Sequence, residues 1–193
     1  MSTRWLSALA MLLACTNPAV AFELDCAGVD KVVAQAIDQF TELRGKQQSH
    51  ITSGASAAPD LATRERLLGE FSRERWEGTL TLAGASACEV VRVVIGDRKS
   101  MHTATQYACR YPGHTVLPAT LGRSLATCVG RPADPDADPT SLLIMLERVD
   151  SGEGYAITSI GADANPADGM RLLVSHSTCL ARKPAGCDGP DDE

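Results

Sequence analysis

The chain is short of aromatic side chains, with two Trp, three Tyr and three Phe among its 193 residues. Sugars and single-stranded nucleic acids bind on aromatic stacking platforms, so the sequence disfavours both ligands. Positive charge is also scarce, because 18 Lys and Arg stand against 24 Asp and Glu, which gives a net charge of −6. An acidic chain repels phosphate backbones, and we therefore expect no nucleic acid partner.

Motifs that hold cofactors or metals are missing as well. Neither Gly-rich phosphate loop, G-x-G-x-x-G or G-x-x-x-x-G-K-[ST], occurs, and we expect no cofactor. The cysteines include no C-x-x-C pair, and the histidines form neither H-x-x-x-H nor H-E-x-x-H; they are His50, His102, His114 and His176. Zinc sites use such tight spacings because two ligands must reach one ion from a single turn, so we predict no metal site.

Long hydrophobic runs are confined to the start of the chain. Residues 5–14 (WLSALAMLLA) are apolar, but a helix that crosses a bilayer needs about 20 such residues. Arg4 precedes this run and the small residues Ala19-Val20-Ala21 follow it, which is the layout of a secretory signal peptide cleaved after Ala21. We predict a signal peptide over 1–21, no transmembrane segment, and a periplasmic or secreted protein.

Cys15 leaves a second interpretation of the same segment open. It ends the sequence LLAC, which is typical of a bacterial lipoprotein signal in which the cysteine is lipidated and becomes the first residue. The A-x-A site accounts better for the residues after Cys15, so we favour ordinary cleavage over a membrane-anchored lipoprotein. Residues 22–193 are then expected to form a single domain with a frayed acidic C-terminal tail.

Six cysteines follow Cys15, and an even number in an exported chain predicts structural disulfides. Cys88 and Cys109 stand at the outer ends of two apolar runs joined by a polar turn, where a bond would clamp the open end of a hairpin. Cys179 and Cys187 are expected to close a small loop near the C-terminus. The set of predicted disulfide cysteines is completed by Cys26 and Cys128.

Hydrophobic periodicity predicts three helices and six strands. Apolar residues recur at helical spacing over 29–44 and 116–129, and a shorter helix is expected over 60–71, while the small polar residues of 46–59 favour a loop. Period-two alternation predicts strands over 76–82, 87–95, 101–109, 141–149, 155–161 and 170–176. The predicted fold class is α+β, a mainly antiparallel sheet covered by two or three helices and stabilised by disulfides.

The candidate binding surface is made of the ADANPAD loop over 162–168 and two further polar loops. The charged residues of these two further loops are Asp97, Arg98 and Lys99 in the first loop and Asp134, Asp136 and Asp138 in the second. The D-x-D-x-D spacing of the second loop is that of a calcium loop, but Pro139 stands where the sharp turn needs glycine and Met145 where a glutamate is needed. We therefore expect a solvated acidic loop, with weak calcium binding as the less favoured alternative.

No catalytic constellation is visible in the sequence, so we predict a non-enzymatic envelope protein that binds or inhibits a protein partner. Its acidic charge would complement a basic partner. The alternative is an envelope hydrolase whose site is assembled from dispersed residues, namely His102, His176 and a strand carboxylate from Glu89 or Glu147. A structural lipoprotein anchored at Cys15 is the third hypothesis.

Overall fold

The computed structural model describes residues 24–54, 70–96, 99–111, 118–132, 141–165 and 169–181, together with Cys187. The predicted signal peptide and Cys15 lie outside these ranges. So do five of the six predicted binding residues, namely Asp97, Arg98, Asp134, Asp136 and Asp138. The sixth, Lys99, is exposed just before a strand.

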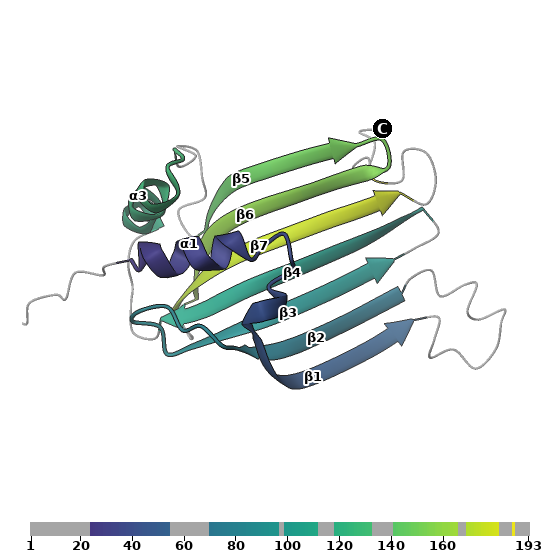
Figure 1. The fold of residues 1–193 in the computed structure, drawn as a ribbon, viewed down its shortest axis with the longest axis horizontal. Coiled ribbons are helices and arrows are strands. Elements are labelled where there is room, and N and C mark those ends of the chain that lie inside the picture. Colours follow the sequence, from purple (N-terminus) through teal and green to yellow (C-terminus); the bar gives the residue numbers. More distant parts are fainter. Residues whose placement is uncertain are drawn as a thin grey trace, which may run out of the picture.

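A seven-stranded antiparallel sheet makes up most of the described structure (Figure 1). In chain order the strands are β1 (Arg44–Gly54), β2 (Glu70–Gly78), β3 (Ala87–Gly96), β4 (Ser100–Tyr111), β5 (Ser141–Ser151), β6 (Gly154–Asn165) and β7 (Gly169–Ala181). Their order across the sheet is β1-β2-β3-β4-β7-β6-β5. The first four strands and the last three are therefore two meanders, which join where β7 pairs with β4.

Two short helices lie over the same face of this sheet (Figure 1). Helix α1 (Cys26–Ala34) begins after Asp25, whose side chain accepts a hydrogen bond from the Gly28 N–H at 2.9 Å and so caps the helix. Helix α3 (Pro118–Val129) ends before Gly130, which has a φ of +62°. The Cys26–Cys128 disulfide bonds the start of α1 to the end of α3. No described helix is long and apolar enough to cross a membrane.

The α+β prediction, with two or three helices covering the sheet, is wrong. Helices of 9 and 12 residues cover only part of one face of a sheet that has seven strands. The helix predicted over 29–44 ends at Ala34, and the loop predicted over 46–59 contains most of β1. Most of the helix predicted over 60–71 lies outside the described residues, and its last two residues belong to β2.

The strand predictions hold better. The hairpin predicted over 87–95 and 101–109 forms β3 and β4, and the three later strands form β5, β6 and β7 with greater lengths than expected. The strand predicted over 76–82 ends at Gly78. In the β3–β4 hairpin Cys88 stands directly opposite Cys109, with Cα atoms 4.1 Å apart, and the two form a disulfide. The third disulfide joins Cys179 to Cys187.

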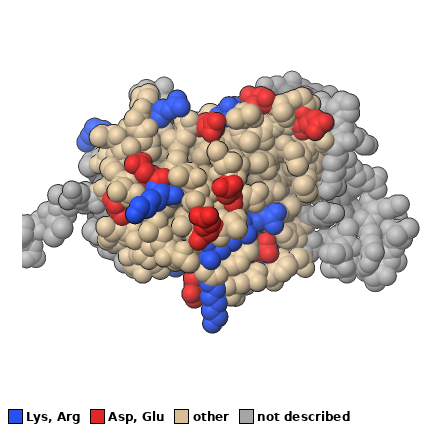
Figure 2. Space-filling view, in the orientation of Figure 1, with Lys and Arg blue, Asp and Glu red and all other residues tan. Residues whose placement is uncertain are grey.

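Charged side chains of both signs are interspersed over the described part of the helix-bearing face (Figure 2). The described residues include as many Lys and Arg as Asp and Glu, so the acidic excess of the chain comes from residues outside them. Segments 134–138 and 188–193 contribute much of this excess. The acidic surface expected from composition is therefore not a property of the sheet.

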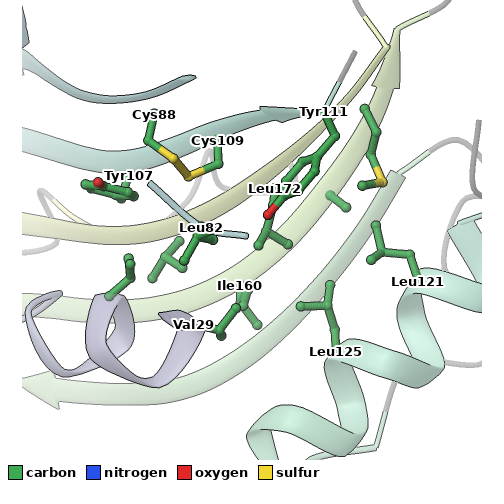
Figure 3. Packing of buried hydrophobic residues seen from close by; sticks show 14 of the residues in the cluster. Val29, Leu82, Cys88, Tyr107, Cys109, Tyr111, Leu121, Leu125, Ile160 and Leu172 are labelled. Atoms are coloured by element: carbon green, nitrogen blue, oxygen red, sulfur yellow. A yellow bond between two sulfur atoms is a disulfide. The ribbon is translucent and has the colours of Figure 1, made fainter. Parts of the chain in front are cut away.

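The core lies between the two helices and one half of the sheet (Figure 3). Val29 of α1 and Leu125 of α3 point into it, and the strands contribute a matching row of buried residues: Val90, Tyr107, Val174 and Ile160. Phe40, which follows α1, packs against Tyr107 with ring centroids 5.9 Å apart. Burial of this apolar surface is the main stabilising contribution that the described residues offer.

Candidate functional site

Polar residues replace the apolar ones beyond the core, on the same face of the sheet. Two positions along β3, β4, β7 and β6 from the core row, a line of polar side chains crosses the sheet and continues onto β2 and β5. We call this line the polar row: Glu74 (β2), Arg92 (β3), Thr105 (β4), His176 (β7), Thr158 (β6) and Glu147 (β5). Each member stands directly opposite the next in register, and residues so paired project from the same face.

His176 is the buried centre of the polar row. Its side chain is only 8% exposed, and its Nδ1 lies 2.9 Å from the Thr158 hydroxyl. Burial lowers the pKa of the imidazole, while the charge of Glu147 acts in the opposite direction and raises it. On the other side of His176, Thr105 is fully buried, and its hydroxyl has no hydrogen-bond partner among the described residues. Buried hydroxyls without partners are unusual, so this position has unused hydrogen-bonding capacity.

Two arginines gather at the β2–β3 end of the row. Arg92 Nη1 donates to Glu74 Oε2 at 3.2 Å, and the guanidinium of Arg44 lies 4.4 Å from the centre of the Trp76 ring. The pKa of Arg44 is lowered by its burial and by the charge of Arg92, and is raised by Glu74. We call these four residues the arginine corner.

A cavity of about 340 Å³ opens at the β5 end of the row. Its lining residues are Val33, Ala34, Ile37, Arg131, Leu146, Glu147 and Thr158. The pairing of β5 with β6 is irregular between Met145 and Glu147, and this bulge lets both Leu146 and Glu147 face the cavity. Ile37 is 66% exposed at the cavity although it is a large apolar residue. The cavity therefore combines aliphatic walls with a few polar groups.

Residues 35–43 run from the end of α1 to β1 and border the polar row. Gln39 and Phe40 in this segment have φ angles of 54° and 56°, a left-handed backbone conformation that residues other than glycine rarely adopt. The Gln39 carbonyl accepts a hydrogen bond from Arg44 Nη2 at 3.0 Å. The segment thus connects the cavity, near Ile37, with the arginine corner. We call the surface made by the cavity, the polar row and the arginine corner the shelf.

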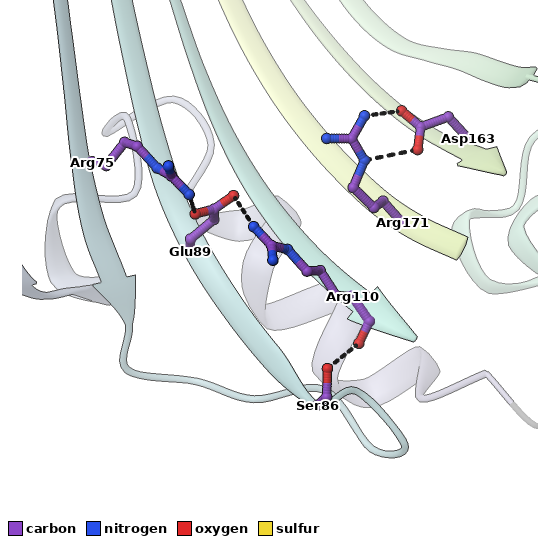
Figure 4. Close-up of polar contacts among 6 residues, drawn as sticks. All are labelled: Arg75, Ser86, Glu89, Arg110, Asp163 and Arg171. Atoms are coloured by element: carbon purple, nitrogen blue, oxygen red, sulfur yellow. Dashed lines mark hydrogen bonds and ion pairs between the residues drawn. The ribbon is translucent and has the colours of Figure 1, made fainter. Parts of the chain in front are cut away.

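The opposite face of the sheet is held by ion pairs (Figure 4). Glu89 lies between Arg75 and Arg110 and pairs with both, while Arg171 donates two hydrogen bonds to Asp163. Each arginine of this set therefore has a carboxylate partner. These residues have their charge satisfied locally and form a structural network.

The structure separates the residues of the predicted hydrolase site. His176 and Glu147 belong to the polar row, whereas His102 and Glu89 project from the opposite face. His102 is three residues along β4 from Thr105, the partner of His176, which is about 10 Å of strand. Instead, the His102 Nε2 lies 3.0 Å from the Ser100 hydroxyl and 3.5 Å from the Cys179 sulfur. An acid–base pair of the two histidines is not assembled.

Sequence reasoning missed most of the shelf. It singled out His176 and Glu147 but not the arginine corner or the two threonines. The available signal was a polar residue two positions from a core residue in several strands, as in Val90-x-Arg92 and Thr158-x-Ile160. Within the described ranges, no group of three or more His, Cys, Asp or Glu is placed to hold a metal ion. Comparison of the chain with known protein families, curated proteins and solved structures gave no match.

Proposed function

We propose that the protein is an exported binding protein that holds an extended segment of a partner protein on the shelf. The observation that carries this proposal is the cavity of about 340 Å³, with aliphatic walls, at one end of a line of partly buried polar side chains. Ligand sites have this combination of apolar volume and a few placed polar groups.

The length of the shelf favours a polypeptide over a small metabolite. Four strand spacings separate Arg92 on β3 from Glu147 on β5. At about 4.8 Å per spacing, the two side chains stand roughly 19 Å apart. An extended chain of about six residues covers that distance. Its backbone carbonyls would accept from Arg92 and its N–H groups would donate to Glu147, because these two members of the row reach solvent.

The cavity supplies the apolar part of the recognition. Val33 and Leu146 form aliphatic wall, and Ile37 leaves two thirds of its side chain in solvent in the absence of a partner. Covering this residue with an aliphatic side chain removes apolar surface from water and favours association. A polar row beside an apolar cavity also fixes the direction and register of the bound segment.

Export is proposed on separate grounds. Three disulfides join described cysteines, and disulfides form and persist outside the reducing cytosol. The signal peptide over 1–21 would deliver the chain to the periplasm or the medium. Mass spectrometry of the mature N-terminus tests this step, because cleavage after Ala21 leaves a free Phe22, whereas the lipoprotein alternative leaves a lipidated Cys15.

The proposed binding is tested by two matched variants in capture experiments. Ile37→Asp places a charge at the cavity, and Leu143→Asp places one at a residue that is 62% exposed on the opposite face of β5. The immobilised protein is exposed to an envelope extract at low and high salt. Wild type and Leu143→Asp should retain the same partner, and Ile37→Asp should lose it. Equal capture by all three proteins, or none by any, would contradict the proposal.

A further inference from the structure

We propose that the arginine corner is a carboxylate-binding site, which takes one carboxylate group of the partner segment. That the carboxylate belongs to a partner protein rests on the proposed function, whereas the site itself can be tested with small carboxylates. In the partner, the carboxylate is either an acidic side chain or the C-terminus.

The arginine corner holds one more positive charge than negative charge. Arg44 and Arg92 each carry a permanent positive charge, and Glu74 supplies one carboxylate. The neighbouring arginines of β2, Arg73 and Arg75, project from the opposite face, because they alternate with Glu74 along the strand. His50 stands opposite Glu74 on β1 and adds no negative charge. A single carboxylate balances the excess, whereas a phosphate dianion would reverse it.

Both guanidinium groups retain donors that the described residues do not use. Arg92 donates to Glu74 through Nη1, and Arg44 donates to the Gln39 carbonyl through Nη2. The Nε atoms of both arginines are buried without an acceptor among the described residues, and none of these residues accepts from Arg92 Nη2 or Arg44 Nη1, which are the donors left for a ligand. The Arg92 side chain is 33% exposed, so a ligand can reach it from solvent. A guanidinium fork matches the two oxygens of a carboxylate and binds it with charge-assisted hydrogen bonds.

The opposite face provides an internal comparison. There Arg75, Glu89 and Arg110 also combine two arginines with one glutamate, but Glu89 pairs with both arginines through different oxygens. In the arginine corner, Glu74 is hydrogen-bonded to Arg92, while Arg44 stacks on Trp76. The two trios have the same formal charge, but in the arginine corner one arginine, Arg44, makes no carboxylate contact among the described residues. Arg44 is part of the shelf.

Trp76 makes binding observable, because the guanidinium of Arg44 lies over its ring. The chain has two tryptophans, so in a Trp5→Phe chain all tryptophan fluorescence comes from Trp76. We would titrate that protein with N-acetylglycine, which has a terminal carboxylate, with N-acetylaspartate α-amide, which has a side-chain carboxylate, and with N-acetylglycinamide, which has none. Both carboxylates should change the emission and the amide should not. The probe that binds with the higher affinity shows whether the natural carboxylate is a C-terminus or an acidic side chain.

Three variants then decide whether the arginine corner is responsible. Arg92→Gln should weaken carboxylate binding about tenfold, the usual loss for one charge-assisted hydrogen bond. Glu74→Gln removes the competing carboxylate and should strengthen it. Arg75→Gln is the control, because Arg75 also pairs with a glutamate and is 32% exposed on the other face; it should bind as wild type does.

Three results would overturn the proposal: an equal response to the amide, weaker binding by Glu74→Gln, or equal losses in Arg75→Gln and Arg92→Gln. Glu74→Gln and the comparison of probes remain decisive even where Arg92→Gln does not fold. The outcome is also separable from that of the proposed function. Capture lost in Ile37→Asp without any carboxylate response would leave the shelf as a binding surface and remove only the carboxylate site.

Discussion

The Thr158 hydroxyl lies 2.9 Å from His176 Nδ1, and this contact joins β6 to β7 in the middle of the polar row. It leaves the other ring nitrogen of the nearly buried imidazole outside this contact, while Thr105 stands opposite His176 on β4. The neutral ring can satisfy this arrangement with one donor and one acceptor nitrogen. A protonated ring would bring a buried charge beside two hydroxyl groups, with Glu147 as the nearest acidic member of the row.

Stability should therefore fall on acidification through His176. Burial holds the pKa of His176 below 6.5 in the folded protein, while the unfolded chain titrates near 6.5. Below about pH 6.5 the unfolded state binds a proton that the folded state does not. The free energy of unfolding therefore decreases as the pH falls, until the pH has passed below the pKa of His176 in the folded protein. Each pKa unit of depression corresponds to about 1.4 kcal/mol. Above about pH 7.5 this group adds no pH dependence.

Denaturant unfolding of wild type, His176→Gln and Glu147→Gln between about pH 7.5 and pH 5.5 measures the effect. His176→Gln should flatten the decline in stability. Glu147→Gln should steepen or extend it, because the Glu147 charge raises the pKa of His176. Identical pH profiles for wild type and His176→Gln would rule out His176 as the cause.

The three disulfides should contribute unequally, because they close loops of different size. The separations are 102 residues for Cys26–Cys128, 21 for Cys88–Cys109 and 8 for Cys179–Cys187. Chain entropy predicts losses of about 4.7, 3.3 and 2.5 kcal/mol when each pair is replaced by alanine. Urea unfolding of the three double variants gives the ranking. A larger loss from the pair near the C-terminus than from Cys26–Cys128 would show that local packing outweighs loop closure.

The β3–β4 hairpin could be predicted because its signals are local. Apolar residues alternate along both strands, the polar turn is short, and the two cysteines fall in register once the strands pair. A turn that set Ile95 opposite Met101 would leave the two cysteines one residue out of register, whereas Ile95 stands opposite His102 and Cys88 opposite Cys109. In the shifted register Cys88 and Cys109 would project from opposite faces of the sheet, so the observed register is the one that permits the disulfide.

Strand β1 escaped prediction because it is an edge strand without a buried face. Its residues RGKQQSHITSG are mostly polar, and even Ile51 is exposed. The helix predicted over 29–44 failed for another reason. Its apolar residues do recur at helical spacing, but the backbone turns at Gln39. Phe40 therefore lies in that turn when it packs into the core, and Ile37 is left exposed to solvent. Apolar periodicity records which side chains need burial and does not determine the backbone that buries them.

The polar row could not be found in the sequence because its six members become neighbours only after the strands are ordered. His176 and Thr105 are opposite each other because β7 pairs with β4 across the junction of the two meanders. That pairing is a long-range choice that no local pattern encodes. The arginine corner depends in the same way on the β2–β3 register, which sets Arg92 opposite Glu74.

Gly154 at the start of β6 should tolerate no side chain. Its φ is +150°, and a Cβ there would stand 1.9 Å from the Cys179 carbonyl oxygen and 3.4 Å from the Cys187 sulfur. Gly154→Ala should therefore cost about 3 kcal/mol, because a backbone atom must move. Gly152→Ala, two residues earlier, is the control, since a Cβ at Gly152 meets nothing within 4 Å. Thermal unfolding compares the two, and equal melting temperatures would contradict this assignment.

Gln39→Gly should stabilise the protein, although glycine usually has the opposite effect. Gln39 is held at a φ of 54°, a conformation that costs a non-glycine residue about 1 kcal/mol and costs glycine little. The Gln39 carbonyl, which accepts from Arg44, is retained in the variant. We expect a gain of roughly 0.5–1 kcal/mol in urea unfolding. Ala34→Gly in the last turn of α1 is the control and should lose a similar amount. A loss in both variants would mean that the turn at Gln39 is not strained.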